Sequence, residues 1–92
     1  MTTAIVMLKV KRGQVTQTAE ALLEIAGVTE AYSVTGDYDL IAIVRVKSPD
    51  DIADCVTERL QKVAGIEDSY THVAFRVYSK HDLEEAFSLG AS

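Results

Sequence analysis

The 92-residue chain contains one cysteine, one proline, no tryptophan and no asparagine. Because Cys55 is alone, an internal disulfide or a metal site with several thiolate ligands is excluded, and a reducing cytoplasm is the expected compartment. The longest apolar run, residues 4–8, is five residues long, far below the ~20 that span a bilayer. No basic stretch followed by a long apolar segment opens the chain, so we expect no secretory signal. These absences predict a cytoplasmic protein with no membrane partner.

Positive charge is also scarce. Nine Lys and Arg residues stand against 14 Asp and Glu residues, a formal net charge of -5. A nucleic-acid surface needs clustered Lys and Arg that displace counterions from phosphates, so direct nucleic-acid binding is not expected. Hydrophobic residues make up 48% of the chain and charged residues 25%, which is ordinary for one small globular domain. A core of this size gains stability from a partner subunit.

The first half of the chain alternates between strand and helix patterns. Residues 3–10 are rich in β-branched side chains and predict a central strand. From Val15 the apolar residues recur at helical spacing, and Gly27 is the expected end of this helix. The stripe on that helix consists of Ala19, Leu22, Leu23 and Ala26. Residues 28–35 and 38–46 predict two strands, joined by a hairpin turn at Gly36 and Asp37.

The second half opens with the clearest local signal. Ser48 is followed by Pro49 and two aspartates, which predicts the N-terminus of a helix. This helix is expected to end at Gly65 and to bury one stripe: Ile52, Val56, Leu60 and Val63. Residues 66–78 then predict a fourth strand. Residues 79–92 predict a short C-terminal helix and tail, with Leu83, Ala86 and Phe87 on one side. We therefore divide the chain into a domain of residues 1–78 and a tail of residues 79–92.

The order of elements predicts the fold class. A β-α-β-β-α-β order with right-handed crossovers gives an α+β, ferredoxin-like fold, with two helices on one face of a four-stranded antiparallel sheet in the order 4-1-3-2. The other face of the sheet would meet water in a monomer and should then be polar. The first strand instead has apolar residues on both of its faces, with Ile5 and Met7 on one face and Val6 and Leu8 on the other. We therefore predict a homodimer that packs sheet against sheet as a dimeric α+β barrel-like assembly, and a larger ring of dimers.

Two short runs suggest a family. Residues 34–40, Val-Thr-Gly-Asp-Tyr-Asp-Leu, and residues 65–71, Gly-Ile-Glu-Asp-Ser-Tyr-Thr, resemble motifs of the leucine-responsive/asparagine regulator (Lrp/AsnC) family. The likeness covers about residues 3–78 and includes the order of elements. Members of that family usually carry an N-terminal helix-turn-helix domain before an effector-binding domain, often called a RAM domain. Because the first strand begins near residue 3, this chain resembles a stand-alone RAM domain.

The resemblance implies a non-enzymatic sensor of transcription regulation. It would bind a small amino acid between subunits near Gly36 and would need no cofactor or metal. It would modulate regulators of its own family, and mixed assembly with a full-length Lrp/AsnC regulator is a further expected interaction. Two alternatives stay open on the residues alone. One is a small dimeric ferredoxin-like enzyme of the monooxygenase or isomerase type, for which His72 and Arg76 are the only candidates. The other is an assembly module without a ligand.

The predicted ligand site combines the loop with the last strand. A free amino acid needs an anion for its ammonium and hydrogen-bond donors for its carboxylate. Backbone N–H groups around the loop supply the donors, and Asp39 is the preferred partner of the ammonium. Two strand spacings, roughly 10 Å, separate the loop from the start of the last strand. The predicted site residues are Gly36, Asp37, Tyr38, Asp39, Ser69 and Thr71, although the Gly-Asp pair alone is equally typical of a simple hairpin turn.

Four further side chains have a structural and a functional interpretation. Cys55 is predicted to be a buried small hydrophobe and not a nucleophile. For His72 we expect a structural or interface role, because no second ligand or acid–base partner is evident on its face. Tyr32 and Tyr70 are expected on the open sheet face or at a seam between subunits, and the seam is the preferred interpretation.

Overall fold

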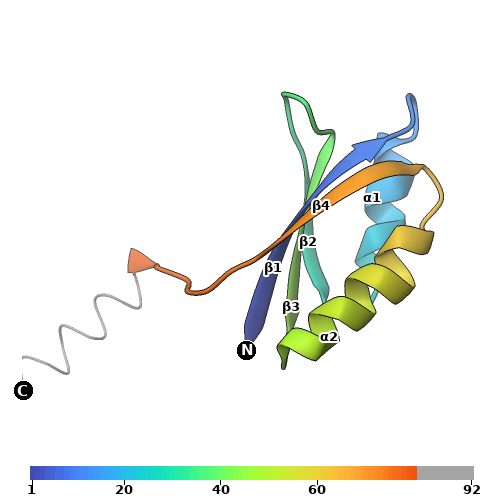
Figure 1. The fold of residues 1–92 in the computed structure, drawn as a ribbon. Helices are drawn as coiled ribbons and strands as arrows, with labels where there is room; N and C mark the ends of the chain where they lie inside the picture. The colour runs from blue at the N-terminus through green and yellow to red at the C-terminus, as the bar shows by residue number, and fades with distance from the viewer. Residues whose placement is uncertain (81–92) are drawn as a thin grey trace, which may run out of the picture.

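The computed structural model describes residues 1–80, which form one four-stranded antiparallel sheet covered on one face by helices (Figure 1). The strands stand in the order β2-β3-β1-β4, as predicted. In chain order the elements are β1 (Thr2–Val10), α1 (Val15–Leu23), β2 (Val28–Ser33), β3 (Leu40–Val46), α2 (Pro49–Ala53), the π-helical turn η1 (Asp54–Arg59), the 3-10 turn η2 (Leu60–Lys62) and β4 (Ile66–Val73). The ferredoxin-like fold is therefore confirmed.

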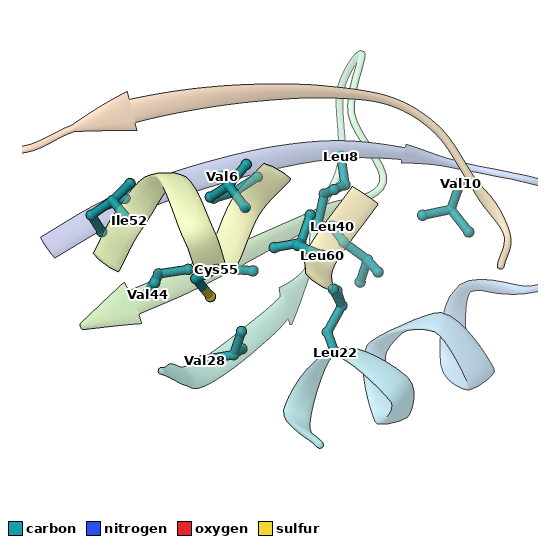
Figure 2. Packing of buried hydrophobic residues seen from close by; sticks show 13 residues of the cluster. Val6, Leu8, Val10, Leu22, Val28, Leu40, Val44, Ile52, Cys55 and Leu60 are labelled. Atoms are coloured by element: carbon teal, nitrogen blue, oxygen red, sulfur yellow. The ribbon is translucent and has the colours of Figure 1, made fainter. Parts of the chain in front are cut away.

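The hydrophobic core lies between the sheet and the helices (Figure 2). Alternate residues of β1 point toward the helices, because successive side chains of a strand lie on opposite faces. Leu8 is fully buried there against residues of β3, α1 and the second helical stretch. The buried apolar side chains of this cluster include Val6, Leu8, Val10, Leu22, Val28, Leu40, Val44, Ile52, Val56 and Leu60. The helix stripes predicted from the sequence account for four of these positions, Leu22, Ile52, Val56 and Leu60.

The other face of the sheet, here called the open face, also carries apolar side chains. Strand register places Ile5 beside Ile43, and it places Ile41 between Met7 and Tyr32. On β4, Tyr70 lies opposite Met7. Ile5 is 38% exposed, Tyr32 49% and Tyr70 56%. The expected apolar character of this face is confirmed. Both tyrosines lie on it, which was one of their two expected places, and their position at a seam between subunits stays a prediction.

The apolar stripe of α1 differs from the predicted one. Leu22 is fully buried, but Leu23 is 50% exposed, and Thr18 is buried in its place. The reason is helical geometry, because residues four apart share a face while adjacent residues lie about 100° apart. The Thr18 hydroxyl donates a hydrogen bond to the carbonyl oxygen of Ala64 at 3.5 Å, which satisfies its polar group in the core.

The second helical stretch begins as predicted but does not continue as a regular α-helix. Ser48 caps it by accepting a hydrogen bond from the Asp51 N–H at 3.4 Å, and Pro49 occupies the first turn. From Asp54 the backbone becomes π-helical. The stripe residues Ile52, Val56 and Leu60 repeat every four residues, which is longer than the 3.6-residue α-helical turn. In a regular α-helix these three residues would therefore rotate gradually away from the sheet. A wider π-helical turn within the stretch compensates for this rotation, and all three side chains are buried.

The fourth strand is shorter than predicted. It ends at Val73 and not at residue 78. Val73 pairs with Ala4, and the Ala74 N–H still donates to the carbonyl oxygen of Thr3 at 2.8 Å. Residues 74–80 form no further strand with β1 and extend away from the sheet (Figure 1). Arg76 therefore lies outside the strand that carries His72, although the sequence predicted both residues on one face of that strand.

The predicted C-terminal helix and tail were placed at residues 79–92. Nearly all of this segment, including Leu83, Ala86 and Phe87, lies outside the described residues 1–80. Among the helices of residues 1–80, none has the length and apolar character needed to cross a membrane.

Candidate functional site: the loop between β2 and β3

Residues 34–39 form a loop that is wider than the predicted two-residue turn. The strands end at Ser33 and resume at Leu40, and the Val34 N–H donates to the carbonyl oxygen of Asp39 at 3.1 Å. Gly36 has a φ of +105°, a conformation that L side chains rarely adopt. No other atom lies within 4 Å of where its Cβ would be. The glycine is therefore required by the backbone, and it leaves open space above the loop.

Asp39 holds one end of this loop against β1. Its backbone N–H donates to the carbonyl oxygen of Leu8 at 2.8 Å, and its carboxylate Oδ2 accepts from the N–H of Val10 at 2.8 Å. Oδ1 has no hydrogen-bond partner among the residues that the structure describes. These bonds explain the wide loop, because they tie residue 39 to β1. They also orient the carboxylate, so its free oxygen has a defined position.

Tyr38 leaves the loop toward the open face and meets an aromatic cluster. Its ring lies edge-on to that of Tyr70, with centroids 6.0 Å apart at 82°, and Lys9 Nζ lies 5.8 Å from the Tyr38 centroid. Tyr70 stacks in turn on His72, at 6.4 Å and 16°. Partial burial, together with nearby acidic groups, raises the pKa of the Tyr38 phenol above its ordinary value. We call Lys9, Tyr38, Tyr70 and His72 the aromatic cluster.

Ser69 and Thr71 lie on the other face of β4. Strand register places Ser69 opposite Leu8 and Thr71 opposite Val6, whose side chains point toward the helices. Ser69 lines a shallow polar hollow of about 300 Å³ next to Gln61 of η2. The structure therefore brings Gly36, Asp37, Tyr38 and Asp39 together in one loop. Within one chain it does not bring Ser69 and Thr71 to the same face as Tyr38.

Sequence reasoning did not include Lys9, Tyr70 and His72 among the site residues. The available signal was the alternation of β4, where Asp68, Tyr70 and His72 share the face opposite to Ser69 and Thr71. Tyr70 is thus the residue of β4 that the loop contacts directly.

Cys55 is buried in the wall of a second hollow, described below. Its Sγ lies 3.6 Å from the carbonyl oxygen of Ala26, and only 2% of the residue is exposed. Burial raises the pKa of the Cys55 thiol, and the nearby Arg59 partly opposes this shift. A buried thiol that keeps its proton is a poor nucleophile. The predicted role as a small hydrophobe is confirmed.

Several known proteins are similar to this chain in sequence and in fold. The family model of the Lrp/AsnC ligand binding domain matches residues 3–83. The HTH-type transcriptional regulator FL11 of Pyrococcus furiosus is 26% identical over 77 residues, which are 84% of this chain and 50% of that regulator. The crystal structure of TTHA0845 from Thermus thermophilus is similar with a TM-score of 0.80 and 40% identity, covering 87% of this chain and 100% of the other.

A third similarity concerns the fold alone. The transcriptional regulator NMB0573 from Neisseria meningitidis, solved in complex with L-Met, is 12% identical with a TM-score of 0.74, over 85% of this chain and 52% of its own.

The chain belongs to the Lrp/AsnC ligand binding domain family. It spans about half the length of the curated relatives that it matches first, and those relatives are named transcriptional regulators. The family resemblance of residues 34–40 and 65–71 is confirmed. The class that the fold and the matches define is a ligand binding domain of this family, whose curated relatives are named transcriptional regulators.

Proposed function

We propose that this domain binds a small amino acid where the loop of residues 34–39 meets a second copy of the chain, and that it acts in transcription regulation. The observation that carries the proposal is the apolar open face with the loop at its edge. The family match supports a ligand-binding role. The L-Met complex of the regulator from Neisseria meningitidis supports an amino acid as the class of ligand.

The open face has the composition of an interface between copies. Its centre is apolar, with Ile5, Ile41 and Ile43 from the two middle strands. Its margin on the β2 side is polar, where Arg45 Nη1 lies 3.6 Å from Glu30 Oε1 and Tyr32 donates its hydroxyl hydrogen to Glu30. This bond, with the charge of Glu30, raises the pKa of the Tyr32 phenol. An apolar centre with a polar rim is typical of protein interfaces. Two such sheets can pack face to face about 10 Å apart.

Residues beyond the end of β4 add further exposed apolar side chains. Phe75, Val77 and Tyr78 follow the end of β4, and all three are exposed in a single chain. Exposed apolar side chains in one contiguous stretch mark an interaction site. The sheet-to-sheet dimer that we propose places a partner over the open face. Such dimers would then assemble further, either into a ring or with a full-length regulator of the family.

The polar groups of the loop suit a zwitterion. Asp39 Oδ1 is available to an ammonium group while Oδ2 is held by the Val10 N–H. Asp37 is exposed beside it, and the backbone around Gly36 is open toward solvent. Hydrogen bonds to charged groups contribute roughly 1.5–3 kcal/mol each. In this proposal Ser69 and Thr71 contribute from the β4 edge of a neighbouring copy, because in their own chain they lie on the face opposite to Tyr38.

Replacing Asp39 tests this assignment. In wild type, an amino acid at about a hundred times its Kd stabilises the fold by ~2.7 kcal/mol, which raises the Tm of a domain this size by roughly 10–20 °C. Asp39→Asn keeps an oxygen acceptor for the Val10 N–H but removes the charge. We expect it to fold normally and to lose the rise in Tm in a thermal-shift screen of the twenty amino acids.

Two further variants separate binding from folding. Asp39→Ala removes the acceptor as well, so we expect a loss of about 1–3 kcal/mol of stability in addition to the lost response. Leu23→Ala, on the exposed side of α1, serves as a control that keeps the response. An Asp39→Asn protein that binds the amino acid as tightly as wild type by calorimetry would show that the ammonium is bound elsewhere. A wild-type protein that responds to none of the twenty would favour the assembly module without a ligand.

A further inference from the structure

A second hollow lies at the other end of β3 from the loop. Its volume is about 290 Å³. Four parts of the chain form its walls: the turn before β2, the end of β3, the first turn of α2 and the π-helical turn η1. The lining residues are Ala26, Gly27, Arg45, Val46, Lys47, Asp51, Asp54, Cys55 and Arg59. Because the length of β3 (Leu40–Val46) separates it from residues 34–39, it is distinct from the site proposed above.

The π-helical turn is what brings opposite charges to this hollow. Asp54 and Arg59 are the first and last residues of η1, five positions apart. In an α-helix, residues five apart point about 140° away from each other. A π-helical turn closes its hydrogen bonds between residues five apart, so its first and last residues lie on one side. Both side chains line the hollow, and such turns are frequent at functional sites.

The charges around the hollow are incompletely paired. Arg45 pairs with Glu30, and Asp51 Oδ2 accepts a hydrogen bond from the Ser48 hydroxyl at 3.1 Å. Within residues 1–80, by contrast, Lys47, Asp54 and Arg59 form no ion pair. Asp54 and Arg59 share a side of the turn without contacting each other. The lining charges without an ion pair among residues 1–80 are thus two cations, Lys47 and Arg59, and two carboxylates, Asp51 and Asp54, of which Asp51 is also held by Ser48.

The remaining wall is apolar and closely packed. Gly27 forms part of it with a φ of +100°, and a Cβ at this position would come within 2.9 Å of Val46 Cγ1 and 3.6 Å of Cys55 Sγ. Ala26, Val46 and Cys55 add apolar surface beside the charged groups. A pocket that combines apolar walls with a few polar groups is typical of small-ligand sites, and here the polar groups are the exposed side chains of Lys47, Asp54 and Arg59.

We infer that this hollow binds a small zwitterion with a short apolar side chain, at a site separate from the loop. Its carboxylate is held by Arg59 and Lys47, and its ammonium by Asp54. The guanidinium of arginine suits a carboxylate because it can donate two parallel hydrogen bonds. The apolar side chain lies against Val46 and Cys55. Binding in this hollow does not depend on the proposed role of the loop.

A titration with L-valine, followed by amide NMR of the full chain, tests this site. We expect saturable shifts at Gly27, Asp54 and Arg59. Isovalerate lacks the ammonium and L-valinamide lacks the carboxylate, so both should bind at least about tenfold more weakly here, the factor that corresponds to one charged contact of about 1.4 kcal/mol. Shifts at Gly36 and Asp37 report the loop separately, so failure of one site is distinguishable from failure of the other.

Two charge variants complete the test. Arg59→Gln and Asp54→Asn should each weaken the valine-dependent shifts at Gly27 at least about tenfold. Lys62→Gln is the matched control, because Lys62 lies three residues further along the helical stretch, pairs with Glu58 and does not line the hollow. The inference is wrong if L-valine moves none of these signals, if Arg59→Gln binds like wild type, or if the two singly charged analogues bind as well as valine.

Discussion

Replacing Ile41 with glutamate is expected to convert the proposed dimer into folded monomers. Ile41 lies near the middle of the open face, between Met7 of β1 and Tyr32 of β2. In a monomer the new carboxylate would meet water and cost little. In a sheet-to-sheet dimer it would be buried without a partner, which costs several kcal/mol per ion. The substitution also occurs twice in a symmetric interface, so its effect on assembly is doubled.

Sedimentation velocity measures this result, with circular dichroism to show that the monomer keeps its secondary structure. Leu23→Glu is the matched control, because Leu23 is half exposed on α1, on the other side of the molecule from the open face. We expect this control to keep the wild-type sedimentation coefficient. An Ile41→Glu protein that sediments like wild type would mean that another surface joins the copies.

The second large effect concerns stability. Leu22→Ala should lower the free energy of unfolding by about 2–5 kcal/mol, because the fully buried side chain leaves a cavity between α1 and the sheet. Small domains have only about 5–15 kcal/mol of total stability. The neighbouring Leu23 is 50% exposed, so Leu23→Ala should cost less than about 1 kcal/mol, the more so because alanine is the better helix former.

Urea unfolding at one fixed protein concentration compares the two leucine variants. The concentration must be fixed because assembly adds to the apparent stability. The expected result is a clear fall in the midpoint for Leu22→Ala and almost none for Leu23→Ala. Equal losses of unfolding free energy in both variants would contradict the observation that α1 buries Leu22 and leaves Leu23 exposed.

Local patterns in the sequence account for much of the fold. The apolar residues on both faces of β1 predicted a buried core on one side of the sheet and an apolar open face on the other. This was possible because successive side chains of a strand always point to opposite faces. Ser48 and Pro49 predicted the start of α2, because capping is a matter of a few neighbouring residues. The strand order followed from the handedness of the two crossovers.

Features that depend on distant partners were not predictable in the same way. The end of β4 at Val73 depends on its pairing with β1, in which Val73 lies opposite Ala4 near the other end of the chain. The width of the loop depends on Asp39, whose carboxylate bonds to the N–H of Val10, 29 residues away. The π-helical turn depends on packing against the sheet. A repeat of four residues alone does not distinguish it from a regular helix.

In the candidate site, too, local features were predictable from the sequence and features that depend on distant partners were not. The residues of the loop, Gly36 to Asp39, are adjacent in the chain, and sequence alone grouped them correctly as one unit. The facing of Ser69 and Thr71 depends on the register between β4 and β1, in which a shift of one residue exchanges the two faces. Register is not visible in a single sequence, and so Tyr70 was not recognised as the residue that contacts Tyr38.

The central claim is that a second copy of the chain covers the open face. Static light scattering of the wild-type protein at micromolar concentration, without added amino acids, tests it most directly. The chain has a mass of 10.0 kDa, and we predict a measured mass of twice this value or a higher even multiple. A stable monomer of 10.0 kDa under these conditions would contradict the account.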